Sequence, residues 1–214
     1  MYQPAHFIET RRELMHALMD AHPFATLVTL GVEGLNANHL PFELDPGSGE
    51  HGCLRAHVAR SNPVWQDLRD GVEALVIFQG PHAYVSPGWY PTKQAHGRAV
   101  PTWNYVVVHA YGPLRVVEDK AWLRAMVKRL SVRHEAAMAQ PWRLEDAPAD
   151  YIDRMLDAIV GIELPIARLL GKWKVSQNQP RENREGVVRG LRELGGNEGL
   201  PIAELIEQHG NRAD

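Results

Sequence analysis

The stretch Thr102-Trp-Asn-Tyr-Val-Val-Val-His-Ala-Tyr-Gly-Pro-Leu-Arg-Val-Val117 decides the fold class, because it predicts two β-strands in succession. Residues 102–111 are rich in β-branched and aromatic side chains, which favour extended chain. Gly112 and Pro113 then supply turn chemistry before a second apolar run. We therefore predict two strands that join near Gly112.

Short apolar runs separated by turn residues recur along much of the chain. Further strands are predicted at residues 25–30, 35–42, 52–60 and 74–78, with a hairpin turn at 31–34. Helical spacing predicts helices at 11–21, 121–135, 149–159, 182–194 and 200–209, a strand or short helix at 163–170, and a loop at 80–101. The pattern predicts a mainly β fold with added helices, as a mostly antiparallel barrel or sandwich.

Composition limits the classes of function. The 214 residues suffice for one large or two small domains, and a net charge of -3 argues against a general basic field for nucleic acid. One cysteine, Cys53, excludes an internal disulfide and fits a reducing cytosol. The N-terminus lacks the basic and apolar regions of a signal peptide, and no run has the roughly 18 apolar residues of a membrane helix. We predict a soluble cytoplasmic protein.

The segment 57–63 is a candidate phosphate site. If a strand ends near Arg60 and a helix begins at residue 63 with Asn62 as its N-cap, then Arg60, Ser61 and Asn62 lie where helix N–H groups attract anions. That helix is predicted to reach residue 68. His57 faces the other side of a regular strand and joins the site only if the strand end is irregular. The alternative is an ordinary helix cap with a surface arginine.

The entrance of the strand at 102–109 is a second candidate. Thr102 and Asn104 share one face, and Trp103 lies on the other. A flat heteroaromatic ligand needs apolar or aromatic walls and a few fixed amide or hydroxyl partners, and this segment offers both. Core packing with a polar strand entrance explains the same pattern equally well.

A row of polar side chains in residues 171–180 is the third candidate. In extended chain one face carries Lys172, Lys174, Ser176 and Asn178, and the opposite face carries the apolar Trp173 and Val175. Either water or an anionic ligand solvates that row, and the periodicity alone favours water. Gln177 faces away and joins the row only if a bulge or turn precedes Pro180.

Other site chemistries find little support. The chain has eleven histidines but no His-Glu-x-x-His, Gly-x-Ser-x-Gly, Walker A or Gly-x-Gly-x-x-Gly motif, so we predict no metal site and no Rossmann or P-loop site. His39, His57 and His109 fall on predicted strands, which leaves a haem site as a weaker hypothesis. The helix predicted at 200–209 has two glutamates and no Lys or Arg, so it is poorly suited to contact bases in a DNA groove.

Six separated motifs occur in a fixed order. They are Met1-Tyr-x-Pro-x-His-Phe7, Ala37-Asn-His-Leu-Pro41, His57-Val-Ala-Arg-x-Asn-Pro63, Tyr84-Val-Ser-Pro-x-Trp-Tyr90, Val100-Pro-Thr-Trp-Asn-Tyr105 and Gly171-Lys-Trp-Lys-x-Ser-Gln-Asn178. Together they resemble the PaiB-type FMN-binding negative transcriptional regulators, from residue 1 to about residue 192. No single motif would identify the family, but the set does.

The resemblance implies an FMN-binding split β-barrel with flanking helices, similar to pyridoxamine-phosphate oxidases and flavin reductases. The barrel would occupy residues 1–180, and 181–214 would be a helical extension packed on the same domain. The family pattern implies a homodimer with FMN at the subunit interface. The flavin phosphate would lie on Arg60, Ser61 and Asn62, with His57 nearby.

The same resemblance places the isoalloxazine ring near two groups of residues. These are Thr102, Trp103 and Asn104, and the row of Lys172, Lys174, Ser176, Gln177 and Asn178, which the other subunit could donate. The first functional hypothesis is a flavin-dependent regulator, whose FMN state alters the dimer or a partner. The alternative is an FMN-dependent oxidoreductase, in which Lys174 stabilises the reduced ring. Direct DNA binding is not supported by the charge.

Overall fold

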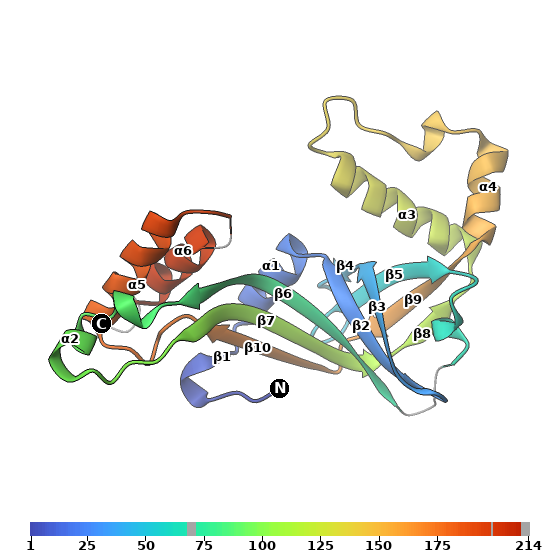
Figure 1. Ribbon diagram of the computed structural model, residues 1–214. Coiled ribbons are helices and arrows are strands. Elements are labelled where there is room, and N and C mark those ends of the chain that lie inside the picture. The colour runs from blue at the N-terminus through green and yellow to red at the C-terminus, as the bar shows by residue number, and fades with distance from the viewer. Residues whose placement is uncertain (68–71, 198, 211–214) are drawn as a thin grey trace. The chain divides into compact units, whose positions relative to one another are not determined.

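The computed structural model describes residues 1–67, 72–197 and 199–210 (Figure 1). The chain divides into two units, and each unit is built from separated pieces of sequence. Unit 1 comprises Met1–Leu18, Gln79–Val108 and Leu170–Asp214, and unit 2 comprises Met19–Phe78 and His109–Leu169. Two long strands, β6 (Glu73–Val85) and β7 (Thr102–Pro113), contribute residues to both units.

Unit 1 contains four neighbouring strands in the order β1-β10-β7-β6, where β1 is Ile8–Glu9 and β10 is Arg168–Lys174. Strand β1 pairs with β10 antiparallel, with Glu9 opposite Gly171. A Cβ at Gly171 would lie 2.9 Å from the Glu9 carbonyl oxygen, so glycine permits this close pairing. The 3-10 turn η1 (Ala5–Phe7) precedes β1, and helix α1 (Arg12–Ala21) follows it.

Unit 1 also contains several helical elements. The short elements η3 (Pro87–Trp89) and α2 (Thr92–His96) lie between β6 and β7, and α5 (Arg181–Leu194) and α6 (Gly199–Gly210) follow β10. Helices α5 and α6 lie side by side (Figure 1), with Val187, Leu191, Ile202 and Ile206 buried. Gly195 and Gly196, both with positive φ, end α5 as its glycine pair predicts.

Two glycines of α5 allow the η3 turn to pack directly on the helix backbone. A Cβ at Gly186 would lie 2.0 Å from the Trp89 carbonyl oxygen, and one at Gly190 would lie 2.4 Å from the Trp89 ring. Glycine costs helix stability, so its presence twice on one face is explained by this contact. The contact fixes the chain between β6 and β7 against α5.

Unit 2 contains the neighbouring strands β6-β2-β3 and a second sheet in the order β4-β5-β9-β8. The new strands are β2 (Phe24–Gly31), β3 (Gly34–Pro41), β4 (Glu43–Asp45), β5 (Cys53–Ala59), β8 (Arg115–Val117) and β9 (Ile159–Pro165). The predicted hairpin is confirmed, since β2 and β3 pair antiparallel up to Gly31 opposite Gly34. Strand β9 pairs with β5 and β8, both antiparallel.

Two helices and a short turn in unit 2 share a small hydrophobic cluster. Helix α3 (Lys120–Glu135) begins at the N-cap Asp119, whose carboxylate accepts the Trp122 N–H at 2.6 Å. Helix α4 (Ala149–Asp157) packs against α3, and the turn η4 (Leu144–Asp146) lies between them in sequence. Leu123, Leu144, Ile152 and Leu156 form the buried cluster that joins these elements.

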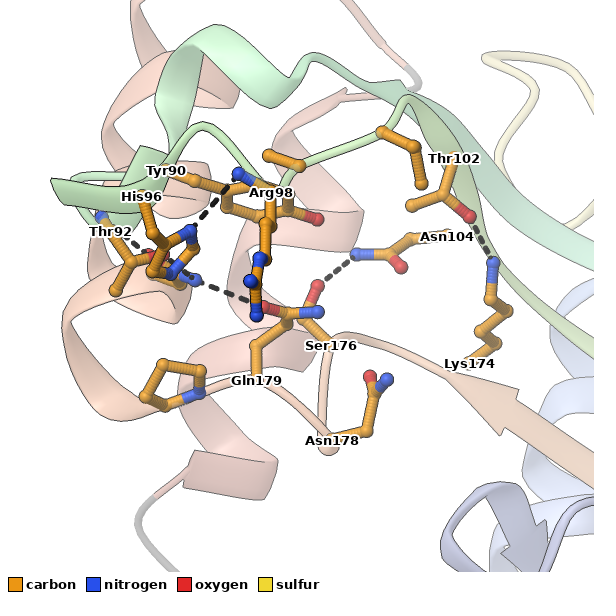
Figure 2. Close-up of a pocket in the computed structure, with 14 residues that line it drawn as sticks. Tyr90, Thr92, His96, Arg98, Thr102, Asn104, Lys174, Ser176, Asn178 and Gln179 are labelled. Carbon is orange, nitrogen blue, oxygen red and sulfur yellow. Dashed lines mark hydrogen bonds between the residues drawn. The ribbon is translucent and has the colours of Figure 1, made fainter. Parts of the chain in front are cut away.

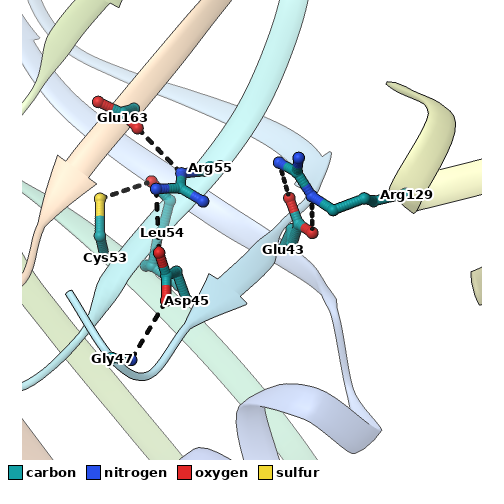
Figure 3. Close-up of polar contacts among 8 residues, drawn as sticks. All are labelled: Glu43, Asp45, Gly47, Cys53, Leu54, Arg55, Arg129 and Glu163. Carbon is teal, nitrogen blue, oxygen red and sulfur yellow. Dashed lines mark hydrogen bonds and ion pairs between the residues drawn. The ribbon is translucent and has the colours of Figure 1, made fainter. Parts of the chain in front are cut away.

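Ion pairs link strands of the second sheet to one another and to α3 (Figure 3). The Arg55 guanidinium bridges Glu163 at 2.9 Å and Asp45 at 3.0 Å, and Arg129 of α3 holds Glu43 through two nitrogens. Beside them the buried Cys53 thiol has its pKa raised to about 11, first by burial and then by Glu163. This thiol therefore stays protonated at neutral pH and is a poor nucleophile.

Several predicted element boundaries are wrong. Residues 80–85 continue β6 instead of forming a loop, and β7 runs through Gly112 to Pro113. The predicted helix after Asn62 is a single 3-10 turn, η2 (Pro63–Trp65), and its predicted end at residue 68 lies outside the described residues. The open choice at 163–170 is settled in favour of strands, since β9 ends at Pro165 and β10 begins at Arg168.

The predicted division into a barrel at residues 1–180 and a helical extension at residues 181–214 stays a prediction.

None of the helices in the described part of the chain has the length and apolar character that a membrane-spanning helix needs.

We expect Gly186→Ala to destabilise the protein, because the new methyl group overlaps the backbone of Trp89. The overlap outweighs the roughly 1 kcal/mol that alanine gains over glycine inside a helix. The free energy of unfolding should fall by about 1–3 kcal/mol in a denaturant titration. The exposed Arg189→Ala on the same helix is the matched control, and equal stability of the two variants would contradict the packing argument.

Candidate functional site

Unit 1 contains a cavity of about 400 Å³ with two walls of different origin (Figure 2). One wall comes from the chain between β6 and β7 and from the start of β7. The other comes from the end of β10, the turn after it and the first turn of α5. The lining residues are Tyr90, Thr92, His96, Arg98, Ala99, Val100, Thr102, Asn104, Lys174, Ser176, Asn178, Gln179, Pro180 and Asn183.

Lys174, the last residue of β10, places an ammonium group on one side of the cavity. Its Nζ donates to the Thr102 hydroxyl and to the Trp103 carbonyl oxygen, the latter at 2.6 Å. The pKa of Lys174 is lowered, first by burial and then by the neighbouring charge of Lys172. Because the charged form is disfavoured there, an anionic ligand would stabilise it.

Strand β10 ends at Lys174, and the chain then turns at Ser176. Ser176 has φ of +63°, a left-handed conformation that costs a side-chain-bearing residue about 1–2 kcal/mol. Its hydroxyl accepts a hydrogen bond from the Asn104 amide nitrogen at 2.8 Å, and both side chains are buried. This bond joins β7 to the turn and places both residues in the cavity wall.

The turn replaces the extended chain that the periodicity suggested beyond Lys174. Gln177 folds back on its own backbone: its Oε1 accepts the Val175 N–H at 2.8 Å, and its Nε2 donates to the Trp173 carbonyl. It therefore does not line the cavity, although the turn before Pro180 on which its inclusion depended is present. Trp173 and Val175 are buried, as predicted.

A buried amide connects the two walls of the cavity. Asn183, in the first turn of α5, is 3% exposed. Its Oδ1 accepts the N–H and hydroxyl of Thr92 at 3.3 and 3.1 Å, and its Nδ2 lies 2.9 Å from the Thr92 hydroxyl and 3.0 Å from the Gln179 side-chain oxygen. The start of α2 is thereby fixed against the turn after β10.

Basic side chains line the cavity, and acidic ones do not occur among its described lining residues. Lys174, Arg98 and His96 line it, and no aspartate or glutamate is among its lining residues in the described part of the chain. The remaining polar groups are amides and hydroxyls, while Tyr90, Val100 and Pro180 supply apolar surface. Such a lining suits an anionic ligand with a flat, hydrogen-bonding body.

Two other predicted residues point elsewhere. Lys172 is buried, donates to the Tyr2 carbonyl oxygen at 3.0 Å, and lies 5.3 Å from the Tyr105 ring centre. The Trp103 ring is 52% exposed and packs edge-on against Tyr84, with ring centres 6.0 Å apart. Of the residues predicted near the ring, Thr102, Asn104, Lys174, Ser176 and Asn178 line the cavity, while Trp103, Lys172 and Gln177 do not.

The predicted phosphate residues all belong to unit 2, and Arg60 already has partners there. Its guanidinium donates to Glu118 at 2.8 Å and to the carbonyl oxygens of Asp157 and Ile159 at 2.8 and 3.2 Å. Asn62 is a helix cap, as predicted, because its side chain accepts the Val64 N–H. Ser61 is exposed. The role of this segment in binding phosphate stays a prediction.

The three strand histidines also lie in unit 2, on the predicted strands. The Nδ1 of His57 is buried and has no hydrogen-bond partner in the described part of the chain, and burial lowers the pKa of His57. His39 contacts the Thr26 hydroxyl at 3.2 Å, and His109 contacts the Tyr111 hydroxyl at 3.4 Å. The described residues include no cluster of three or more potential metal ligands.

The sequence prediction missed the cavity wall between residues 90 and 100. Thr92, His96 and Arg98 fall in the segment that was predicted as an irregular loop. A signal was nevertheless present: residues 74–117 and 164–181 contain no aspartate or glutamate, and these two stretches supply nearly the whole cavity lining.

The fold and the cavity together define a class, the split β-barrels with flanking helices. The flavocytochrome Anf3 from Azotobacter vinelandii has a similar structure, with a TM-score of 0.59 and 14% identity over 78% of this chain and 69% of that chain. The two antiparallel sheets and this match confirm the predicted fold class.

The family follows from the sequence itself. A family model described as "Putative FMN-binding domain" matches residues 1–168, so the chain belongs to this family, the PaiB type that the motifs predicted. "Protease synthase and sporulation protein PAI 2" of Bacillus subtilis is 29% identical over 207 residues, which cover 97% of each chain. "Uncharacterized protein AN0679" of Emericella nidulans is 33% identical over 249 residues, covering 100% of this chain and 99% of the relative.

We expect Ser176→Ala to destabilise the protein by about 1–3 kcal/mol, because it leaves the buried Asn104 amide donor without a partner. Asn178→Ala removes an exposed side chain from the same turn and should leave stability unchanged. The free energies of unfolding from denaturant titration compare the two. A loss no larger in Ser176→Ala than in Asn178→Ala would show that the Asn104–Ser176 bond does not hold the turn.

Proposed function

We propose that this protein binds FMN in the unit 1 cavity and acts as an FMN-dependent regulator of the PaiB type. The observation that carries the proposal is the lining of the cavity, with cations at two places, amides and hydroxyls between them, and no carboxylate among the described lining residues. Membership of the FMN-binding family supports the choice of flavin over other anions with a flat body.

The residues present fit the chemistry of FMN. The flavin ring carries acceptor atoms along its pyrimidine edge, and the Lys174 ammonium and the Asn178 amide are donors for such an edge. Val100, Tyr90 and Pro180 offer apolar contact to a planar ring. A volume of about 400 Å³ falls within the usual range of small-molecule sites.

The regulatory part of the proposal concerns assembly. We infer a homodimer in which FMN lies near the subunit interface, so that flavin occupancy changes the dimer or its contact with a partner. The exposed aromatic rings of Tyr84 and Trp103 support this idea, because they pack against each other where Trp103 follows the cavity residue Thr102 on β7, and both would gain from burial. With a net charge of -3, direct DNA binding would need a local basic surface.

One observation favours a second candidate, an FMN-dependent oxidoreductase. Lys174 is a partly buried cation without a carboxylate partner in the described part of the chain. FMN itself supplies hydride and electron transfer when it is bound, and a cation near its pyrimidine edge favours the reduced, anionic form. The contribution of Lys174 would be electrostatic, and its removal would lower the reduction potential of the bound flavin.

The first test is a titration with FMN that follows flavin fluorescence and absorbance. Lys174→Met removes a charged donor from the cavity and should weaken FMN binding roughly tenfold to hundredfold. Lys93→Met, which removes an exposed lysine of α2 that does not line the cavity, is the matched control. Absence of flavin binding by the wild-type protein would refute the proposal, and equal affinities of the two variants would place FMN elsewhere.

The two candidate activities give different results with the FMN complex. Regulation predicts that FMN changes the mass in light scattering, or the retention of a DNA or protein partner, without turnover. The oxidoreductase predicts that NADPH bleaches the bound flavin and that an acceptor restores its colour over repeated cycles. A Lys174→Met complex with an unchanged reduction potential would contradict the electrostatic role of Lys174.

A further inference from the structure

We propose that Arg98 and His96 form the phosphate-binding end of the cavity, so that the protein selects a flavin phosphate over riboflavin. This inference rests on the proposed FMN function and goes beyond it by assigning an orientation to the ligand. Figure 2 shows His96 and Arg98 on one side of the cavity and Lys174 with Thr102 on the other, with the Asn104–Ser176 pair between them.

The first argument is the availability of charge. The Arg98 guanidinium lines the cavity and is exposed, and no carboxylate is paired with it in the described part of the chain. Arg98 also lies within the stretch 74–117, which contains no acidic residue. A phosphate would therefore meet an uncompensated guanidinium, whose fork geometry matches two phosphate oxygens.

The two alternative cations already have partners. The guanidinium of Arg60 has three donor contacts, and Glu118 balances its charge at 2.8 Å. The Lys174 ammonium donates to two uncharged oxygens, at the end of the cavity that would face the ring. Arg98 is thus the lining cation with the most unused donor capacity.

His96 adds a directed donor beside Arg98. Its Nδ1 accepts the backbone N–H of Arg98 at 3.0 Å, and an accepting Nδ1 places the proton of a neutral imidazole on Nε2. The ring therefore offers an N–H donor in the same part of the cavity lining as Arg98. An arginine fork and an imidazole N–H together provide three donors for the oxygens of one phosphate group.

The segment that carries these groups is held in place. Gly97 ends α2 in the left-handed conformation, with φ of +66°, and its N–H bonds the Lys93 carbonyl at 2.8 Å. At the start of α2, Thr92 is anchored to the buried Asn183. Arg98 and His96 therefore project from a segment that is fixed at its start, and less ordering is required on binding.

The test compares the dissociation constants of FMN and riboflavin for the wild type, Arg98→Gln and Arg60→Gln. We expect the wild type to prefer FMN, and Arg98→Gln to lose roughly tenfold to hundredfold in FMN affinity with riboflavin affinity unchanged. Arg60→Gln should keep the wild-type preference. A retained preference in Arg98→Gln overturns the proposal, and loss of the preference in Arg60→Gln instead assigns phosphate binding to residues 60–62.

A measurement on the wild-type protein guards against a variant that fails to fold. Inorganic phosphate should raise the apparent dissociation constant for FMN and leave that for riboflavin unchanged, because riboflavin leaves the phosphate-binding end free. Equal competition against both flavins, or none against FMN, counts against the proposal. A wild type that binds neither flavin refutes the proposed function as well, whereas flavin binding without phosphate selectivity refutes only the role of Arg98 and His96.

Discussion

The hydrogen bond between the Asn104 amide and the Ser176 hydroxyl is the interaction on which the cavity depends. Both groups are buried, so each would be costly without the other, and the pair holds Ser176 in a left-handed conformation. That conformation ends the extended chain after Lys174 and sends it toward α5. The two walls of the cavity therefore meet because one buried bond stabilises a turn that the backbone alone disfavours.

Charge adds a second constraint. Nearly all of the cavity lining comes from two stretches without acidic residues, and none of the described lining residues is acidic, so its cations are not neutralised from within the wall. Elsewhere in the chain arginines are paired: Arg55 with Asp45 and Glu163, and Arg129 with Glu43. The contrast separates two uses of the same side chain, because paired arginines link elements of unit 2 while Arg98 keeps its charge available. A basic residue whose charge is not already paired with a carboxylate therefore indicates an anion site better than a basic residue alone.

The predictability of the structure depends on whether a residue acts locally. The β2–β3 hairpin and the Asn62 cap follow from short-range turn and capping chemistry, so the sequence alone predicts them. The sequence predicts a loop residue at Gly80 and a turn residue at Gly112, yet both lie within strands. A Cβ at Gly112 would lie 2.1 Å from the Pro165 carbonyl oxygen, so glycine is needed there because another part of the chain approaches closely. Such contacts leave no local signal.

The same distinction explains the success and failure at the candidate site. Alternation correctly placed Thr102 and Asn104 on one face and Trp103 on the other, because β7 is regular there. The periodicity of residues 171–178 correctly grouped Lys174, Ser176 and Asn178, but it wrongly added Lys172, which is buried and donates to the Tyr2 carbonyl oxygen. It also gave no sign that Ser176 is left-handed and ends the extended chain. The match to the family model covers residues 1–168, and the wall from Lys174 to Asn183 follows them in the sequence. The hydrogen bonds of Ser176 with Asn104 and of Asn183 with Thr92 join that second wall to the first, so contacts between distant residues complete the cavity.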